Sequence, residues 1–122
     1  MAKVTYSSTK GLVVSSGTGF QVNDAPILEE IEDVTSGAAP VDAAGHGITR
    51  VTSGGTAGVE AVDVDDGTAA GQLKTIIFHK ETAGGDSLSV TQGGVAIGAA
   101  LAAEGDFLHL LWNGSTWVEV AR

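Results

Sequence analysis

Short apolar runs separated by clusters of turn residues are the feature of this 122-residue chain that most limits its fold. From residue 46 onward the runs recur about every ten residues, and most end at a cluster rich in Gly, Asp, Asn or Ser. Runs of this length and spacing are typical of all-β sandwiches and barrels. They occupy residues 48–52, 59–64, 74–79, 88–90, 95–101, 107–112 and 117–120.

No convincing amphipathic helix separates these runs, so parallel βαβ units are not expected. We therefore predict an all-β fold, a small antiparallel β-sandwich or barrel with an extended N-terminal arm. Residues 95–101 are rich in Ala, which leaves a helix open there as an alternative. Residues 107–112 are nearly all apolar, as is typical of a central strand buried on both faces.

Two of the turn clusters predict particular geometry. Asp65-Asp66-Gly67 predicts a tight turn, because Gly tolerates a positive φ. The triplet at residues 113–115, Asn-Gly-Ser, predicts a tight hairpin.

The tetrapeptide Val-Thr-Ser-Gly occurs at residues 34–37 and again at 51–54. We interpret it as shared turn chemistry rather than as an internal repeat, because Ser and Gly are common in the loops of this chain.

Residues 1–45 predict an arm and linker that precede a domain at residues 46–122, where most of the aromatic residues lie. Residues 27–34 carry apolar side chains at helical spacing after Pro26, although a strand remains open. Residues 35–47 are rich in Ala and Gly and indicate a linker. We expect the arm to gain order on a neighbouring subunit; the alternative is that it adds strands to the same domain. Its candidate interface residues are Leu12, Val13, Val14, Phe20, Ile27 and Ile31.

The charge balance excludes several classes of partner. The chain carries 15 acidic and 6 basic residues, a formal net charge of −9, and its basic residues are scattered. Because nucleic-acid binding depends on Lys and Arg that displace counterions from phosphates, we expect neither nucleic acid nor an anionic membrane as a partner. The absence of Cys excludes a disulfide framework and a Cys nucleophile. The first residues lack the apolar stretch of a secretory signal.

No combination of residues predicts catalysis, so we expect no enzyme activity, no cofactor and no resident metal. The three His residues are far apart in sequence, although His79 and His109 could become neighbours across a sheet. Residues 63–66 superficially resemble a calcium loop, but the twelfth position holds Lys74 in place of a bidentate Glu. A weak Ca²⁺ site there, completed by another acidic loop such as residues 104–106, stays open. The Gly-rich residues 53–58 lack the Lys of a phosphate-binding loop.

Trp112 and Trp117 flank the predicted hairpin and have two interpretations. Exposed Trp rings beside a loop, together with His109, would form a stacking platform for a sugar ligand. Tryptophans one hairpin apart more often pack into the core or into an oligomer interface, and we favour that interpretation.

The second half of the chain carries a series of motifs that resemble one family. They are Gly71-Gln-Leu-Lys-Thr-Ile-Ile77, Gly84-Gly-Asp-Ser-Leu-Ser-Val-Thr91, Gly105-Asp-Phe-Leu-His-Leu-Leu-Trp112 and Ser115-Thr-Trp-Val-Glu-Val120. This stretch is similar to small β-rich virion proteins of tailed bacteriophages, such as capsid decoration proteins and fibre components. The resemblance begins at Gly67 and covers less than half of the chain, and its motifs are structural rather than catalytic.

The resemblance implies a capsid decoration (cement) protein that binds and stabilises the shell of the major capsid protein as an oligomer, expected to be a homotrimer. It implies residence on the capsid exterior after synthesis in the host cytoplasm. The acidic composition suits the outside of a particle better than contact with packaged DNA. The alternative is a receptor- or glycan-binding module of a tail fibre or spike.

Overall fold

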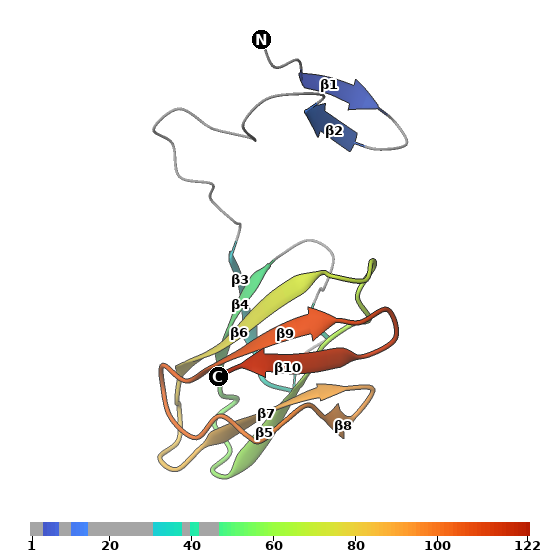
Figure 1. Cartoon of the computed structure of the whole chain (residues 1–122). Helices are drawn as coiled ribbons and strands as arrows, with labels where there is room; N and C mark the ends of the chain where they lie inside the picture. Colours follow the sequence, from blue (N-terminus) through green and yellow to red (C-terminus); the bar gives the residue numbers. More distant parts are fainter. Residues whose placement is uncertain (1–3, 8–10, 15–30, 38–39, 42–46) are drawn as a thin grey trace.

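The computed structural model describes residues 4–7, 11–14, 31–37, 40–41 and 47–122. Within these residues there is no helix, and the all-β prediction is confirmed (Figure 1). The strands are β1 (Val4–Ser7), β2 (Gly11–Val14), β3 (Ile31–Thr35), β4 (Ile48–Thr52), β5 (Val59–Asp63), β6 (Leu73–Lys80), β7 (Ser87–Gln92), β8 (Val95–Ala96), β9 (Phe107–Trp112) and β10 (Trp117–Ala121).

All seven runs predicted after residue 46 form strands, from β4 to β10. The Ala-rich run is extended rather than helical: after β8, Leu101 pairs with Leu88 through an isolated β-bridge. The hairpin at residues 113–115 joins β9 to β10, and the Asn113 side chain accepts hydrogen bonds from the amides of Ser115 and Thr116, both at 2.9 Å.

The strands form two mixed sheets, besides a two-stranded pairing of β1 with β2. The first has the order β10-β9-β6-β4-β3 and the second the order β5-β7-β8. The predicted antiparallel arrangement is wrong for three pairs: β3 with β4, β4 with β6, and β5 with β7 run parallel. The reason is that the chain alternates between the sheets from β4 to β7, so that β5 lies between β4 and β6 in the chain, and β6 between β5 and β7. A strand of the opposite sheet therefore makes these two parallel crossovers, in place of a helix. Between β3 and β4 the chain passes Val41, which forms an isolated β-bridge with Val64 next to β5.

The repeated tetrapeptide lies in two adjacent parallel strands, which the turn-chemistry interpretation missed. Val34 lies opposite Val51 and Thr35 opposite Thr52, so the two copies stack in register. The ladder continues past the strand ends, where the Ser36 amide donates to the Thr52 carbonyl and the Ser53 amide to the Lys80 carbonyl, both at 2.9 Å. The repeat therefore marks equivalent positions in successive strands of one sheet.

Part of the segment assigned to the arm belongs to the sheets. β3 is a strand rather than a helix, because its backbone pairs along its whole length with β4. The predicted linker contains Val41, which is fully buried and bridges Val64 at the edge of the second sheet. Leu12, Val13 and Val14 lie in β2. Phe20 and Ile27 lie outside the described residues.

The buried side chains of both sheets form one hydrophobic core. Its largest members come from β6, β9 and β10, including Phe78, Trp112 and Trp117. Lys74 and Thr49 are buried polar residues on the same inner faces, and the Thr49 hydroxyl donates to Glu32 at 2.9 Å. Whether the two sheets make a sandwich or a barrel stays a prediction.

Gly67 shows why the Asp-Asp-Gly cluster ends in glycine. Its φ lies outside the left-handed region, so the positive φ predicted for it is wrong. The Trp112 ring packs directly on its Cα: a Cβ built at Gly67 would lie 2.6 Å from Cδ2 of Trp112. Any larger residue would displace a core tryptophan. The requirement for glycine is therefore one of packing rather than of backbone conformation.

Candidate functional site

The outer face of the five-stranded sheet carries the largest set of apolar side chains outside the core. On β9, Leu108, Leu110 and Trp112 point inward and are buried, while Phe107 and His109 point outward and are exposed. The prediction that residues 107–112 are buried on both faces is therefore wrong for the single chain. β9 is a central strand, but only one of its faces is covered by the chain's own core.

The strand register collects outward apolar residues from all five strands. Leu73 lies opposite Leu111, and Leu111 opposite Val118. A second row crosses the sheet from β3 to β9: it runs from Ile31 through Ile48 and Thr75 to His109, each opposite the next. We call the resulting surface the apolar outer patch; it consists of Ile31, Ile48, Leu73, Thr75, Ile77, Phe107, His109, Leu111 and Val118.

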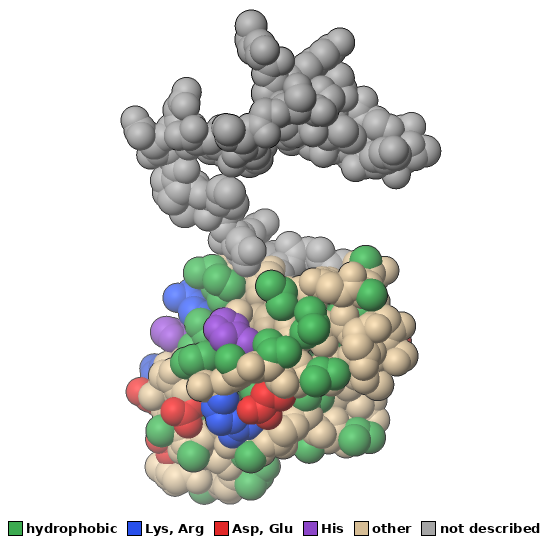
Figure 2. Space-filling view, in the orientation of Figure 1, with side chains coloured by type: hydrophobic (Ala, Val, Ile, Leu, Met, Phe, Trp, Pro, Cys, Tyr) green, Lys and Arg blue, Asp and Glu red, His purple; other side chains and the backbone are tan. Residues whose placement is uncertain are grey.

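These side chains are markedly exposed for their type. Leu73 is 66% exposed, Ile31 46% and Val118 42%. Figure 2 shows hydrophobic side chains gathered around a histidine over the region of β6, β9 and β10. A shallow depression of about 380 Å³ lies among them, lined in part by Ile48, Leu73 and His109. The patch is therefore a flat apolar surface with one local hollow.

The polar groups of the patch are held by local contacts. His109 packs edge-on against Phe107, with ring centroids 5.0 Å apart, and its Nδ1 lies 2.8 Å from the Thr75 hydroxyl. Beside the patch, Arg50 binds Asp33 through two hydrogen bonds of 2.7 and 2.6 Å. These bonds hold the pKa of the Asp33 carboxyl below its ordinary value. The pair carries no net charge, so the patch is electrically neutral.

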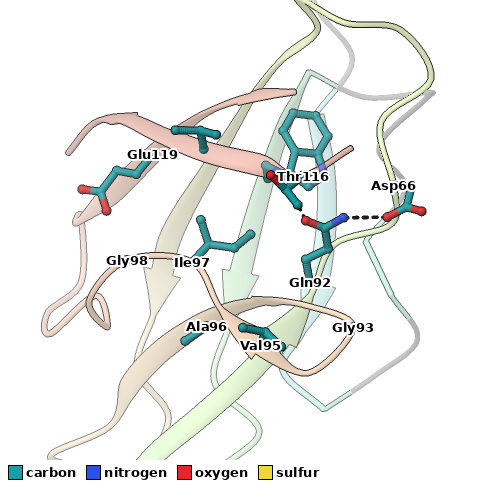
Figure 3. A pocket seen from close by; sticks show the side chains of 11 residues that line it. Asp66, Gln92, Gly93, Val95, Ala96, Ile97, Gly98, Thr116 and Glu119 are labelled. Atoms are coloured by element: carbon teal, nitrogen blue, oxygen red, sulfur yellow. Dashed lines mark hydrogen bonds between the residues drawn. The ribbon is translucent and has the colours of Figure 1, made fainter. Parts of the chain in front are cut away.

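A second hollow, the β8–β10 groove, lies where the edges of the two sheets meet (Figure 3). It has a volume of about 640 Å³ and is lined by both apolar and polar side chains. The Gln92 side chain spans one end, where it accepts from the Trp117 amide at 3.0 Å and donates to Asp66 at 2.6 Å. In Figure 3 Ile97 lies between the two walls, and Glu119 lies at the end opposite Asp66.

Trp112 and Trp117 lie in the core rather than on a stacking platform. They are 5% and 4% exposed, and their ring centroids lie 5.3 Å apart with the planes tilted by 58°. The indole of Trp117 donates to the Asp65 carbonyl at 2.8 Å. Neither ring presents a free face for a sugar. Of the three aromatic candidates, only His109 is on the surface.

The candidate calcium residues are used in internal hydrogen bonds. Asp63 accepts from the Thr91 hydroxyl at 2.6 Å and from the Gly94 amide at 3.0 Å, and these bonds lower the pKa of its carboxyl. Asp106 caps the loop before β9 by accepting from two backbone amides. Among the described residues no group of three or more His, Cys, Asp or Glu side chains is placed to hold a metal.

The Gly-rich loop at residues 53–58 is occupied by a carboxylate of the same chain. Glu60 accepts from the amides of Gly54 and Thr56 and from the Ser36 hydroxyl, which lowers the pKa of its carboxyl. Asp86 accepts in the same way from the hydroxyl of Ser53, the equivalent residue of the repeat. Each Ser of the repeat thus fixes one acidic side chain, and the loop amides serve the fold.

His79 and His109 do not form a pair. The residue opposite His109 on β6 is Thr75, four positions before His79. Along a strand that separation is about 13 Å. His46 lies outside the described residues.

Sequence reasoning found β9 as a central strand but missed that its second face would be open. The signal was available: the outward positions of β6 and β9 include Leu73, Ile77, Phe107 and Leu111, whereas a sheet with one face in water carries mainly polar residues there. Ile31, the one candidate interface residue whose side chain is described, lies on this face.

No family model, curated protein or solved structure matches this chain. In the described part of the chain, no helix has the length and apolar character to cross a membrane.

Proposed function

We propose that this chain is a non-enzymatic capsid decoration protein of a tailed bacteriophage. In this role it binds the major capsid protein on the outside of the shell as an oligomer, expected to be a homotrimer. It is made in the host cytoplasm and resides on the virion. The observation that carries the proposal is the apolar outer patch, because a broad, flat, neutral surface suits the contact between subunits of an oligomer better than a small substrate.

The residues behind the phage resemblance support a structural role. Gly67 and Trp112 pack on each other, and Trp117 completes the core. Asp86 and Asp106 accept hydrogen bonds from the backbone of their own loops. These motifs therefore contribute to the fold of the domain, as the resemblance to structural virion proteins implies. The acidic character of the chain suits a surface that faces solvent.

Copy number and shell binding test this proposal. Particles that contain the protein should carry it in numbers comparable to the major capsid protein. Purified protein should bind particles from which it has been removed and should raise their resistance to heat and osmotic stress. A handful of copies per particle, or stripped particles that keep full resistance, would contradict a cementing role.

The alternative, a receptor- or glycan-binding module of a fibre or spike, is favoured by the β8–β10 groove. Asp66, Thr116 and Glu119 give this groove polar groups at the surface. Glu119→Gln and Thr116→Ala should then abolish binding to cells or glycans and leave the fold intact. Trp117→Ala is unsuitable for this test, because the ring belongs to the core.

A further inference from the structure

We infer that the apolar outer patch is the surface on which a second copy of this chain packs, sheet against sheet. The inference concerns the oligomeric part of the proposed function: it gives a twofold pair of chains where the resemblance implies a homotrimer, and it does not depend on the capsid as target. Its starting point is the pattern of β9, whose inward positions are all apolar and whose outward positions include Phe107 and Leu111, together with the outward Leu73 and Ile77 of β6. Sheets with one face in water alternate apolar and polar residues, whereas strands covered on both faces do not.

The size of the patch fits a protein interface. Five strands spaced about 4.8 Å apart, each about 18 Å long, give the whole outer face an area of roughly 400 Å² in projection. The apolar outer patch shares this face with polar residues such as Asp33, Arg50 and Thr52. The face as a whole has about half the area that each partner contributes to a standard interface of about 800 Å² per side. The patch therefore forms the apolar centre of an interface, and polar residues around it form the rim.

The distribution of charge makes the patch the place where two copies of this acidic chain can meet. The chain carries a net charge of −9, so two copies repel each other over most orientations. The patch contains no carboxylate, and the Asp33–Arg50 pair beside it is neutral. Two copies therefore meet there at the lowest electrostatic cost. A strongly basic partner would be drawn instead to the acidic remainder of the surface.

The shape of the patch is self-complementary. Leu73 projects from β6 with two-thirds of its surface exposed, and it borders the depression that Thr75, His109 and Val120 also line. When two such faces pack about a twofold axis, the same patch of both copies meets itself, and the projecting side chain of each copy lies toward the hollow of the other. Face-to-face sheets about 10 Å apart bury such side chains from both sides.

Charge insertion on the patch tests the inference. Leu73→Lys and Val118→Lys place an ammonium at outward positions without touching the core. We expect the wild-type chain to sediment at a multiple of its single-chain mass, and each variant to raise the dissociation constant at least about 100-fold, because an unpaired charge is buried in the interface. Matched controls are Val59→Lys and Val95→Lys, which alter Val residues of the other sheet that are 73% and 71% exposed.

A cross-link gives a second readout that does not depend on charge. Because the chain has no Cys, His109→Cys introduces a single thiol at the centre of the patch. We expect oxidation to link two copies through it and Val59→Cys to stay uncross-linked. A monomeric wild-type chain, association that survives both patch variants, or dissociation by the Val59 and Val95 variants alike would overturn the inference.

The two proposals fail separately. If the chain is monomeric but still binds stripped particles, the self-association surface is wrong and the decoration role stands. If the chain associates through the patch but binds no shell, the surface is right and the decoration role is wrong.

Discussion

Replacing Gly67 by Ala should destabilise the domain through one contact. The Cβ of Ala would lie 2.6 Å from Cδ2 and 2.8 Å from Cβ of Trp112, closer than real carbon atoms approach. Gly67 has no left-handed φ, so the Ala backbone itself is unstrained. The whole effect therefore arises from displacing Trp112, which is 5% exposed and packs on Trp117.

The expected magnitude follows from the cost of overpacking a core. Forcing one carbon into a filled site costs about 1–3 kcal/mol, because neighbouring side chains leave their preferred rotamers. For a domain of this size, 2 kcal/mol lowers the midpoint of thermal unfolding by about 8–16 °C. Moving Trp112 also changes its coupling to Trp117, so the near-ultraviolet circular dichroism of the folded variant should change.

Urea unfolding of Gly67→Ala, followed by Trp fluorescence, measures the loss directly. Gly84→Ala is the matched control, because Gly84 has no left-handed φ and no atom near its added Cβ; it should be neutral or slightly stabilising. Combining Gly67→Ala with Trp112→Leu should remove most of the added cost, since the clashing ring is gone. If Gly67→Ala unfolds within about 0.5 kcal/mol of wild type, the packing argument is refuted.

Three further predictions concern the same domain. Val41→Ala should lower the free energy of unfolding by about 2 kcal/mol in urea titration, while Val95→Ala, at an exposed position, should be nearly neutral. Hydroxyl and amide donors lower the pKa values of the Asp63 and Asp86 carboxyls on folding. Their stabilising contribution is therefore present above the unfolded pKa of about 3.9 and is lost as the pH falls below it. Asp86→Asn should flatten the decline of the melting temperature between about pH 5 and pH 3, and an unchanged slope would contradict this. Arg50→Gln should leave the melting temperature almost unchanged in calorimetry, because the Arg50–Asp33 pair is exposed to solvent.

The strands from β4 to β10 were predictable because each depends on local pattern. Alternation in β6 and the Asn-Gly turn before β10 are readable from a few neighbouring residues. The strand partners were not, because parallel pairing through the opposite sheet joins segments far apart in the chain. Val41 shows the same limit: a single Val among Ala and Gly gives no periodicity, yet it fills a core position. The role of Gly67 depends on a tryptophan 45 residues later and has no local signal.

The outer face illustrates a different limit. The apolar character of β9 was read correctly, but the prediction assumed that the second layer would come from the same chain. A sequence records how much apolar surface must be covered; it does not record which molecule covers it. Apolar residues such as Phe107 and Leu111 therefore carry information about assembly as well as about the fold.

The alternation of the chain between sheets from β4 to β7 has a consequence for how the protein is made. Neither of the two mixed sheets is encoded by a continuous segment, so a nascent fragment that ends before β8 completes neither of them. β10, which supplies Trp117 to the core, follows all the other described strands in the chain. Because non-local pairings slow folding, we expect the domain to fold only once β10 has emerged from the ribosome, in one cooperative and comparatively slow step.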